Sequence, residues 1–141
     1  MFNCQTSPPS DVQHGVPQGS VLGPILFSLY TSPISDVVTP HGLQLGLYAD
    51  DTQLYLAFSF NSSPSMEAAM SAVQLCIVDV NNWMVFNKLK LNQDKTELMI
   101  LASPRLRPRV QISDITIGDC TISSSPSMRN LGSMFDQAAT M

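Results

Sequence analysis

Charged residues are scarce in this 141-residue chain, because they make up 13% of it, about half of the roughly 25% that is typical of soluble domains. Apolar residues make up 44%, which is ordinary for a globular protein. A chain with so little charge either exposes apolar surface or belongs inside a larger body. The net charge of −4 argues against a freestanding nucleic-acid-binding protein, because affinity for phosphate is built largely from Lys and Arg.

Basic residues are absent from the first 87 positions, and all seven of them lie at Lys88 or beyond. The first part of the chain therefore carries only acidic charge, at Asp11, Asp36, Asp50, Asp51, Glu67 and Asp79. Two explanations fit this division: an acidic metal-binding turn beside basic groups that bind a nucleic-acid template, or merely uneven surface charge. The basic cluster at Arg105, Arg107 and Arg109 can touch phosphate, but a solvated loop is the favoured interpretation.

Cysteine and histidine patterns are missing as well. Cys4, Cys76 and Cys120 are odd in number and form no CxxC motif, which argues against a disulfide framework and favours reduced thiols in an intracellular protein. His14 and His41 are isolated, so metal ligation by histidine is not expected. The longest apolar run, residues 21–30, is too short to span a bilayer, and the N-terminus lacks the basic region of a signal peptide. We expect no membrane partner.

Apolar periodicity predicts helices and hairpins in mixed order. Residues 21–30 fit a short buried helix, and a stripe at three- and four-residue steps over residues 66–84 fits a helix of about twenty residues. Residues 43–48 and 52–58 alternate with period two and predict a hairpin, with Asp50 and Asp51 in its turn.

The last third of the chain is expected to be mostly extended. Residues 98–101 form an apolar run typical of a buried strand, and residues 103–109 read as a loop with two prolines. Residues 115–122 predict a hairpin that turns at Gly118-Asp119, and residues 128–135 a last short strand. These elements together predict a two-layer α+β fold, with an antiparallel sheet and helices on one of its faces.

Two motifs carry the chemistry of the sequence. Adjacent carboxylates on a rigid turn, as in Tyr48-Ala49-Asp50-Asp51, can hold Mg²⁺ against nucleotide phosphates. Taken alone, an Asp-Asp pair in a hairpin is most often only a turn. The upstream motif Gly-Val-Pro-Gln-Gly-Ser at residues 15–20 is by itself only a loop before a helix.

Taken together, in this order and at this spacing, the motifs resemble reverse transcriptases of non-LTR retrotransposons, the long-interspersed-element type. The resemblance covers nearly the whole chain from His14 onward. It rests on Gly-Val-Pro-Gln-Gly-Ser-Val-Leu-Gly-Pro-Ile-Leu-Phe at 15–27, Tyr-Ala-Asp-Asp-Thr at 48–52, Leu-Lys-Leu-Asn at 89–92, Lys-Thr-Glu at 95–97 and Asn-Leu-Gly at 130–132.

This resemblance implies a partial polymerase palm. Asp50 would be a catalytic metal ligand with Asp51 supporting it, and Lys95 would stabilise charge or donate a proton at the leaving pyrophosphate. An ordinary exposed lysine explains Lys95 equally well. The family also implies contacts to nucleotide, template and primer: Pro17, Gln18 and Gly19 at the incoming nucleotide and template base, Tyr48 and Ala49 near the primer end, and Leu131 and Gly132 as a primer grip.

The sequence also departs from the family pattern. The first catalytic aspartate of the family precedes the Gly-Pro-Gln loop by a helix and a strand, and Asp11 lies too close to Gly15 to replace it. We therefore interpret residues 1–14 as an N-terminal loop at a truncated edge. Residues 15–141 are interpreted as a partial palm domain without the first catalytic aspartate segment, the fingers or the thumb.

The complete enzyme of this family would synthesise DNA on an RNA template from a DNA primer and deoxynucleotides, with Mg²⁺ as cofactor. For this chain alone we expect no polymerisation and weak or no Mg²⁺ binding, with the missing palm and fingers supplied by another chain. The alternative, from a different class, is a non-catalytic remnant that serves as an interaction module or has no function.

Overall fold

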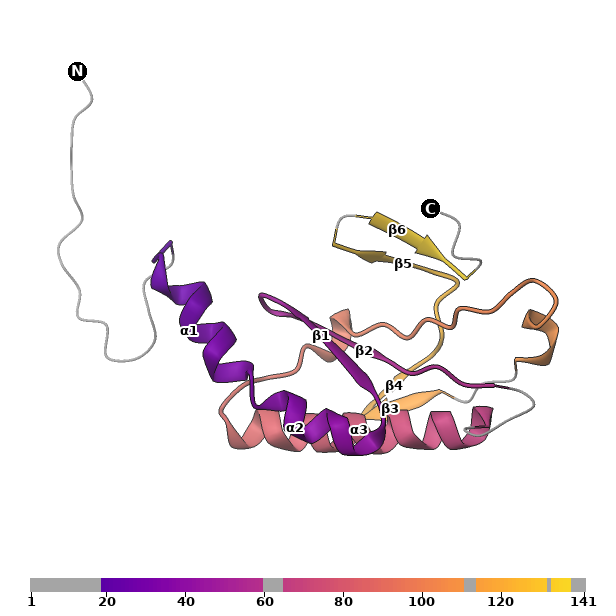
Figure 1. Cartoon of the computed structure of the whole chain (residues 1–141), viewed down its shortest axis with the longest axis horizontal. Helices are drawn as coiled ribbons and strands as arrows, with labels where there is room; N and C mark the ends of the chain where they lie inside the picture. Colours follow the sequence, from indigo (N-terminus) through magenta and orange to yellow (C-terminus); the bar gives the residue numbers. More distant parts are fainter. Residues whose placement is uncertain (1–18, 60–64, 111–113, 132, 138–141) are drawn as a thin grey trace, which may run out of the picture.

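Helix α3 (Met66–Phe86) organises the fold, because separate elements pack against different faces of it (Figure 1). The computed structural model describes residues 19–59, 65–110, 114–131 and 133–137. The other elements are α1 (Leu22–Thr31), α2 (Ile34–Val38), β1 (Gln44–Tyr48), β2 (Asp51–Tyr55), β3 (Ile115–Ile117), β4 (Cys120–Ile122), β5 (Ser127–Asn130) and β6 (Ser133–Asp136), with 3-10 turns η1 (Thr39–His41), η2 (Gln93–Lys95) and η3 (Arg107–Arg109).

The ends of α3 follow from local sequence. Ser65 lies just before the helix in an extended conformation, and its hydroxyl accepts a hydrogen bond from the Ala68 amide at 3.3 Å. At the other end Lys88 takes the left-handed conformation, with φ of 58°. The Leu89 amide then donates to the Met84 carbonyl at 2.8 Å, which is the Schellman arrangement that closes helix ends. The predicted helix over residues 66–84 is confirmed and extends two residues further.

One core cluster joins α3 to α2 and to the start of β1. Its buried members are Ile34, Val38, Leu43, Cys76 and Val80. Burial, with a smaller contribution from Asp79, raises the pKa of the Cys76 thiol, so this thiol stays protonated and serves as a small apolar core group. His41 in η1 hydrogen bonds the Asp79 carboxylate at 2.9 Å and so ties the same elements together at the surface.

A second core cluster packs β3 and β4 against α3. Ile77, Ile115, Ile117 and Ile122 form it. Beside this cluster, Gln74 of α3 hydrogen bonds both backbone groups of Thr116, each at 2.7 Å, and so substitutes for a strand partner at the β3 edge.

The chain has the mixed α+β content that the sequence predicts, with α2 and α3 on one side of the hairpins in the view of Figure 1. The predicted antiparallel sheet, however, is divided within the described residues into three separate two-stranded hairpins, β1–β2, β3–β4 and β5–β6. Alternation of apolar residues reports which face of a strand is buried, but it does not report which strand lies beside it. The predicted hairpins over residues 43–58 and 115–122 are both present.

The predicted strand over residues 98–101 is wrong. This segment makes a single parallel bridge, between Leu98 and Ser124, and Leu101 is 55% exposed. An apolar run of four residues is too short to distinguish a strand from an extended loop that packs on one side. The predicted last strand is instead the hairpin β5–β6, in which Met128 pairs with Phe135.

Helix α1 fits the predicted position but not the predicted burial. Six large apolar side chains of α1 and that of Val21, the residue before it, are at least 37% exposed. The six are Leu22, Ile25, Leu26, Phe27, Leu29 and Tyr30. The Tyr30 hydroxyl ties α1 to the end of α3 through a hydrogen bond to the carbonyl of Asn87, the residue that follows the helix, at 2.7 Å. A helix that is apolar on every side is normally buried in a larger body.

Among the described residues, α3 alone has the length and apolar composition to cross a membrane, judged by those two properties only. Cys76, Ile77 and Val80 on this helix are buried in the two core clusters that α3 forms with α2, the start of β1 and the β3–β4 hairpin. This packing accounts for one side of the helix only, because Leu75, Val78, Val85 and Phe86 on α3 are between 43% and 83% exposed.

Candidate functional site

The β1–β2 hairpin turns on two residues. Tyr48 pairs with Asp51, which leaves Ala49 and Asp50 as the loop. Two-residue loops of this kind match the twist of the flanking strands only when the first loop residue has a positive φ. Ala49 meets this demand with φ of 54°, a conformation that costs an L-residue about 1–2 kcal/mol. The turn is therefore strained at the residue that precedes the two carboxylates, a kind of strain that clusters at functional sites.

Both carboxylates at this tip are open to solvent. Asp50 lies in the turn and Asp51 begins β2, and each side chain is exposed. Two adjacent carboxylates offer the oxygen ligands that Mg²⁺ prefers, and Mg²⁺ is commonly held by one or two carboxylates together with waters and substrate phosphates. Within the described ranges no third His, Cys, Asp or Glu joins them to complete a metal cluster. The two carboxylates are thus oxygen donors of the kind that Mg²⁺ takes, and they would supply part of its ligand set.

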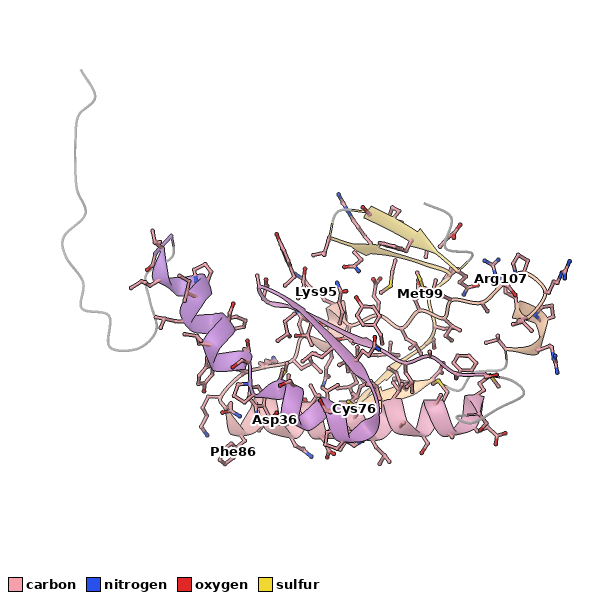
Figure 2. All side chains as sticks on the ribbon, viewed as in Figure 1. Asp36, Cys76, Phe86, Lys95, Met99 and Arg107 are labelled. Atoms are coloured by element: carbon pink, nitrogen blue, oxygen red, sulfur yellow. The ribbon has the colours of Figure 1, made fainter. Side chains whose placement is uncertain are left out.

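Lys95 lies at the end of η2, where its side chain is exposed. In the view of Figure 2 the labelled Lys95 lies on the same side of α3 as the β1–β2 hairpin. No ion pair joins Lys95 to Asp50 or Asp51, all three of which are described. The structure thus does not bring the predicted lysine into contact with the predicted metal ligands.

A side-chain hydrogen bond joins the β1–β2 hairpin to the β5–β6 hairpin, although the two residues are 77 positions apart. The Gln53 amide on β2 donates to the Asn130 side-chain oxygen on β5. Asn130 immediately precedes Leu131, which begins the turn between β5 and β6 and has φ of 47°. The predicted metal turn and the predicted primer-grip turn are therefore on connected hairpins. Gly132, the other predicted primer-grip residue, lies outside the described residues.

Gln53 and Tyr55 connect the two hairpins of the candidate site, and the sequence pattern did not single them out. The Tyr55 hydroxyl donates to the Gln53 side-chain oxygen, which leaves the Gln53 amide free to reach Asn130. Gly46, opposite Gln53, makes room for this arrangement, because a Cβ there would lie 3.3 Å from the Tyr55 ring. A glycine inside an alternating strand often marks such a close approach. Gly46 was therefore the feature of the sequence that indicated a side chain packed against this part of β1.

The structure describes some of the residues predicted to contact primer, nucleotide and template, but not all of them. Tyr48 is 66% exposed at the end of β1, beside Ala49 in the turn. Gly19 is exposed and has φ of +85°, which favours glycine. Pro17 and Gln18 lie outside the described residues, so their predicted contacts with nucleotide and template remain predictions.

Comparisons with known proteins agree with the motif pattern. The chain is 35% identical over 93 residues to the probable RNA-directed DNA polymerase from transposon BS of Drosophila melanogaster, a match that covers 62% of this chain and 10% of that protein. It is 33% identical over 87 residues to the RNA-directed DNA polymerase from mobile element jockey of the same species, covering 57% of this chain and 9% of that protein. The chain thus spans about a tenth of the length of these relatives. No solved structure matches significantly.

The family match extends over most of the chain. A family model described as reverse transcriptase (RNA-dependent DNA polymerase) matches residues 1–135, which include the β1–β2 hairpin, η2 and the β5–β6 hairpin up to Phe135. The resemblance to non-LTR reverse transcriptases is therefore confirmed. The chain belongs to the reverse transcriptase (RNA-dependent DNA polymerase) family.

Proposed function

We propose that this chain is part of the palm domain of a retrotransposon RNA-directed DNA polymerase. In this proposal it presents two of the metal ligands of the active site. The observation that carries the proposal is the strained two-residue turn that projects Asp50 and Asp51 into solvent. A short turn between paired strands restricts the backbone of both carboxylates, and such restriction suits groups that must meet Mg²⁺ at near-ideal geometry.

The chain's own residues would position the primer relative to the metal turn. In this proposal Asp50 is the principal metal ligand and Asp51 supports it, while the bond between Gln53 and Asn130 keeps the Leu131 turn at a fixed separation from them. Bound Mg²⁺ would neutralise charge on the reacting phosphates. Lys95 would place a further positive charge near the leaving pyrophosphate, and Pro17, Gln18 and Gly19 would lie against the nucleotide and template.

The RNA template, the DNA primer and the deoxynucleotides are the proposed substrates. We also propose that the further metal ligand and the nucleotide-binding surfaces come from other parts of a longer polymerase, since the chain matches only about a tenth of its relatives. The exposed apolar residues of α1 support this, because a helix with no charged residue is expected to be covered by other protein in the working enzyme.

A primer-extension assay on the purified 141-residue chain tests the proposal. With an RNA template, a labelled DNA primer, deoxynucleotides and Mg²⁺, the chain alone is expected to add no nucleotides. Two carboxylates without the remaining ligands and the nucleotide-binding surfaces cannot hold the metals and phosphates for phosphoryl transfer. Template-dependent extension that disappears in Asp50→Asn would show that the chain is a complete polymerase and would refute this part of the proposal.

The second candidate function is a non-catalytic interaction module, and the exposure of α1 is the observation that favours it. In this case the apolar surface around Ile25 and Leu29 would bind an apolar surface of a partner protein. Light scattering after size exclusion, followed by thermal unfolding, separates the two cases. A monodisperse monomer that unfolds cooperatively would count against the interaction module.

A further inference from the structure

The side of α3 that faces away from the core carries a regular row of exposed residues. The buried residues of the helix, from Ala69 to Val80, lie on one side of it. On the opposite side, residues at alternating steps of three and four are all exposed, namely Ala68, Ser71, Leu75, Val78, Asn82 and Val85. This spacing is that of the a and d positions of a heptad repeat, where one helix meets another. We call these six residues the outer seam.

The outer seam is apolar at its centre and at one end, although it is open to solvent. Leu75 is 58% exposed, Val78 43% and Val85 62%, and Phe86 beside the seam is 83% exposed. None of the six seam residues is charged. In Figure 1 α3 runs along the lower edge of the molecule, and Figure 2 shows the labelled Phe86 at that edge, away from the hairpins. A helix with one face in the core normally has a charged or polar opposite face, so the seam is a candidate contact surface.

A hollow of about 300 Å³ lies beside the centre of the seam. On α3 it is lined by Gln74, Ile77, Val78 and Asn81, and the turn of the β3–β4 hairpin around Gly118 forms its other wall. Four residues at i, i+3, i+4 and i+7 form the hole that receives a side chain of the facing helix in a helix pair. A cavity of about 150 Å³ can hold benzene, so this hollow has room for a leucine side chain.

The seam is complementary to itself when a second copy of α3 runs antiparallel to the first. In one register every seam residue lies opposite another seam residue, and a two-fold axis repeats each contact. The opposed pairs are Leu75 with Val78, Ser71 with Asn82, and Ala68 with Val85. Apolar residues then meet apolar residues, and the Ser71 hydroxyl meets an amide that can hydrogen bond to it. The second copy's Leu75 faces Val78 and therefore the hollow.

Charge favours the antiparallel orientation. Glu67 is exposed in the first turn of α3, and Lys88 is exposed just beyond its last turn. The register above places Phe86 of the second copy opposite Glu67, so the second copy's Lys88 comes close to this carboxylate. A parallel pair would instead bring each Glu67 near its own copy and align the two helix dipoles unfavourably. Charged residues that flank a seam commonly set the orientation of paired helices in this way.

The exposed apolar area agrees with a weak dimer. The exposed parts of Leu75, Val78, Val85 and Phe86 amount to roughly 400 Å² in each copy, if a whole large apolar side chain contributes about 100–200 Å². The polar residues of the seam add to this area in both copies. The total therefore reaches the roughly 1,000 Å² that a specific interface needs but stays below the standard size of about 1,600 Å².

We propose that the outer seam of α3 binds the same seam of a second copy of this chain, in an antiparallel two-fold dimer with Leu75 and Val78 at its centre. The dimer does not rest on the proposed polymerase function. It leaves the turn at Asp50 open, because the β1–β2 hairpin packs on the core side of α3.

Sedimentation equilibrium of the 141-residue chain from about 1 to 500 µM tests the proposal, with a monomer–dimer equilibrium expected at a Kd of about 1–100 µM. Leu75→Glu should weaken the dimer at least about a hundredfold, because it places unpaired carboxylates at the centre of the interface. The matched control is Leu29→Glu on α1, where the leucine is 66% exposed, and it should change the Kd less than about threefold. Circular dichroism checks that both variants fold.

Two outcomes overturn the dimer. One is a chain that stays monomeric at every concentration, which would leave the seam to a partner of another kind. The other is a Leu29→Glu effect as large as that of Leu75→Glu, which would place the contact on α1.

Charge reversal tests the orientation. Glu67→Lys and Lys88→Glu should each weaken the dimer about three- to tenfold, because each brings like charges together at both ends of the pair. The double variant should recover the original Kd, since opposite charges meet again. A double variant without recovery overturns the antiparallel register. Neither measurement involves polymerisation, so failure of the proposed function would leave both results unchanged.

Discussion

Replacing Ile34 with alanine is expected to lower the free energy of unfolding by about 2–5 kcal/mol. Ile34 is 1% exposed at the start of α2 and belongs to the core cluster that joins α2, β1 and α3. Truncation removes apolar contacts and leaves a cavity, because close-packed surroundings relax only in part. A loss of this size is a large share of the roughly 5–15 kcal/mol that stabilises an ordinary domain.

The matched control is Ile25→Ala on α1, which makes the same chemical change at a side chain that is 55% exposed. We expect a change within about 0.5 kcal/mol, because exposed positions rarely contribute more. Urea unfolding followed by circular dichroism measures both variants, and the dependence on urea should be unchanged if only stability differs. Equal losses in the two variants would mean that α1 contributes to the core as much as α2 does, contrary to the packing described above.

The sequence predicted those elements that are specified by residues close together along the chain. The turn at Asp50, the stripe of α3 and the hairpin around Gly118 each depend on residues within about one element of one another, and the structure contains all three. Helix α2 is absent from the sequence predictions, although Pro33 precedes its first residue and Pro40 follows its last, so neither proline interrupts it. Proline is tolerated at the start of a helix and after its end.

Features that depend on long-range pairing could not be read from the sequence. Residues 98–101 are apolar enough for a strand, but their one bridge, at Leu98, reaches a segment that the local pattern did not identify. The contact between Gln53 and Asn130 spans 77 positions, and only Gly46 hinted that something lay close to β2. Arg107 is half-buried whereas Arg105 and Arg109 are exposed, a difference that composition cannot show.

Replacing Asp50 with asparagine is expected to weaken binding of a divalent cation to this chain by at least about tenfold, or about 1.4 kcal/mol. The change keeps the size of the side chain and its ability to sit in a turn, but it removes the negative charge and one anionic oxygen ligand. Because two carboxylates alone offer few ligands, the binding in the unmodified chain is itself expected to be weak, in the millimolar range of low-charge sites.

Asp119 provides the matched control, because it lies exposed in the Gly118-Asp119 turn of the β3–β4 hairpin. A turn aspartate without a carboxylate neighbour should bind the cation more weakly still, so Asp119→Asn should leave the measured affinity unchanged. An equal loss from the two substitutions would mean that the cation senses general surface charge and not a particular turn.

Paramagnetic Mn²⁺, used in place of Mg²⁺, reports this binding residue by residue through broadening of backbone amide signals in NMR spectra. We expect the signals of Tyr48, Ala49, Asp50 and Asp51 to broaden first and Asp50→Asn to abolish most of this effect. Signals around Asp119 should persist at the same Mn²⁺ concentration. Equal broadening at the two turns, or none at the β1–β2 turn, would contradict the claim that this hairpin presents metal ligands.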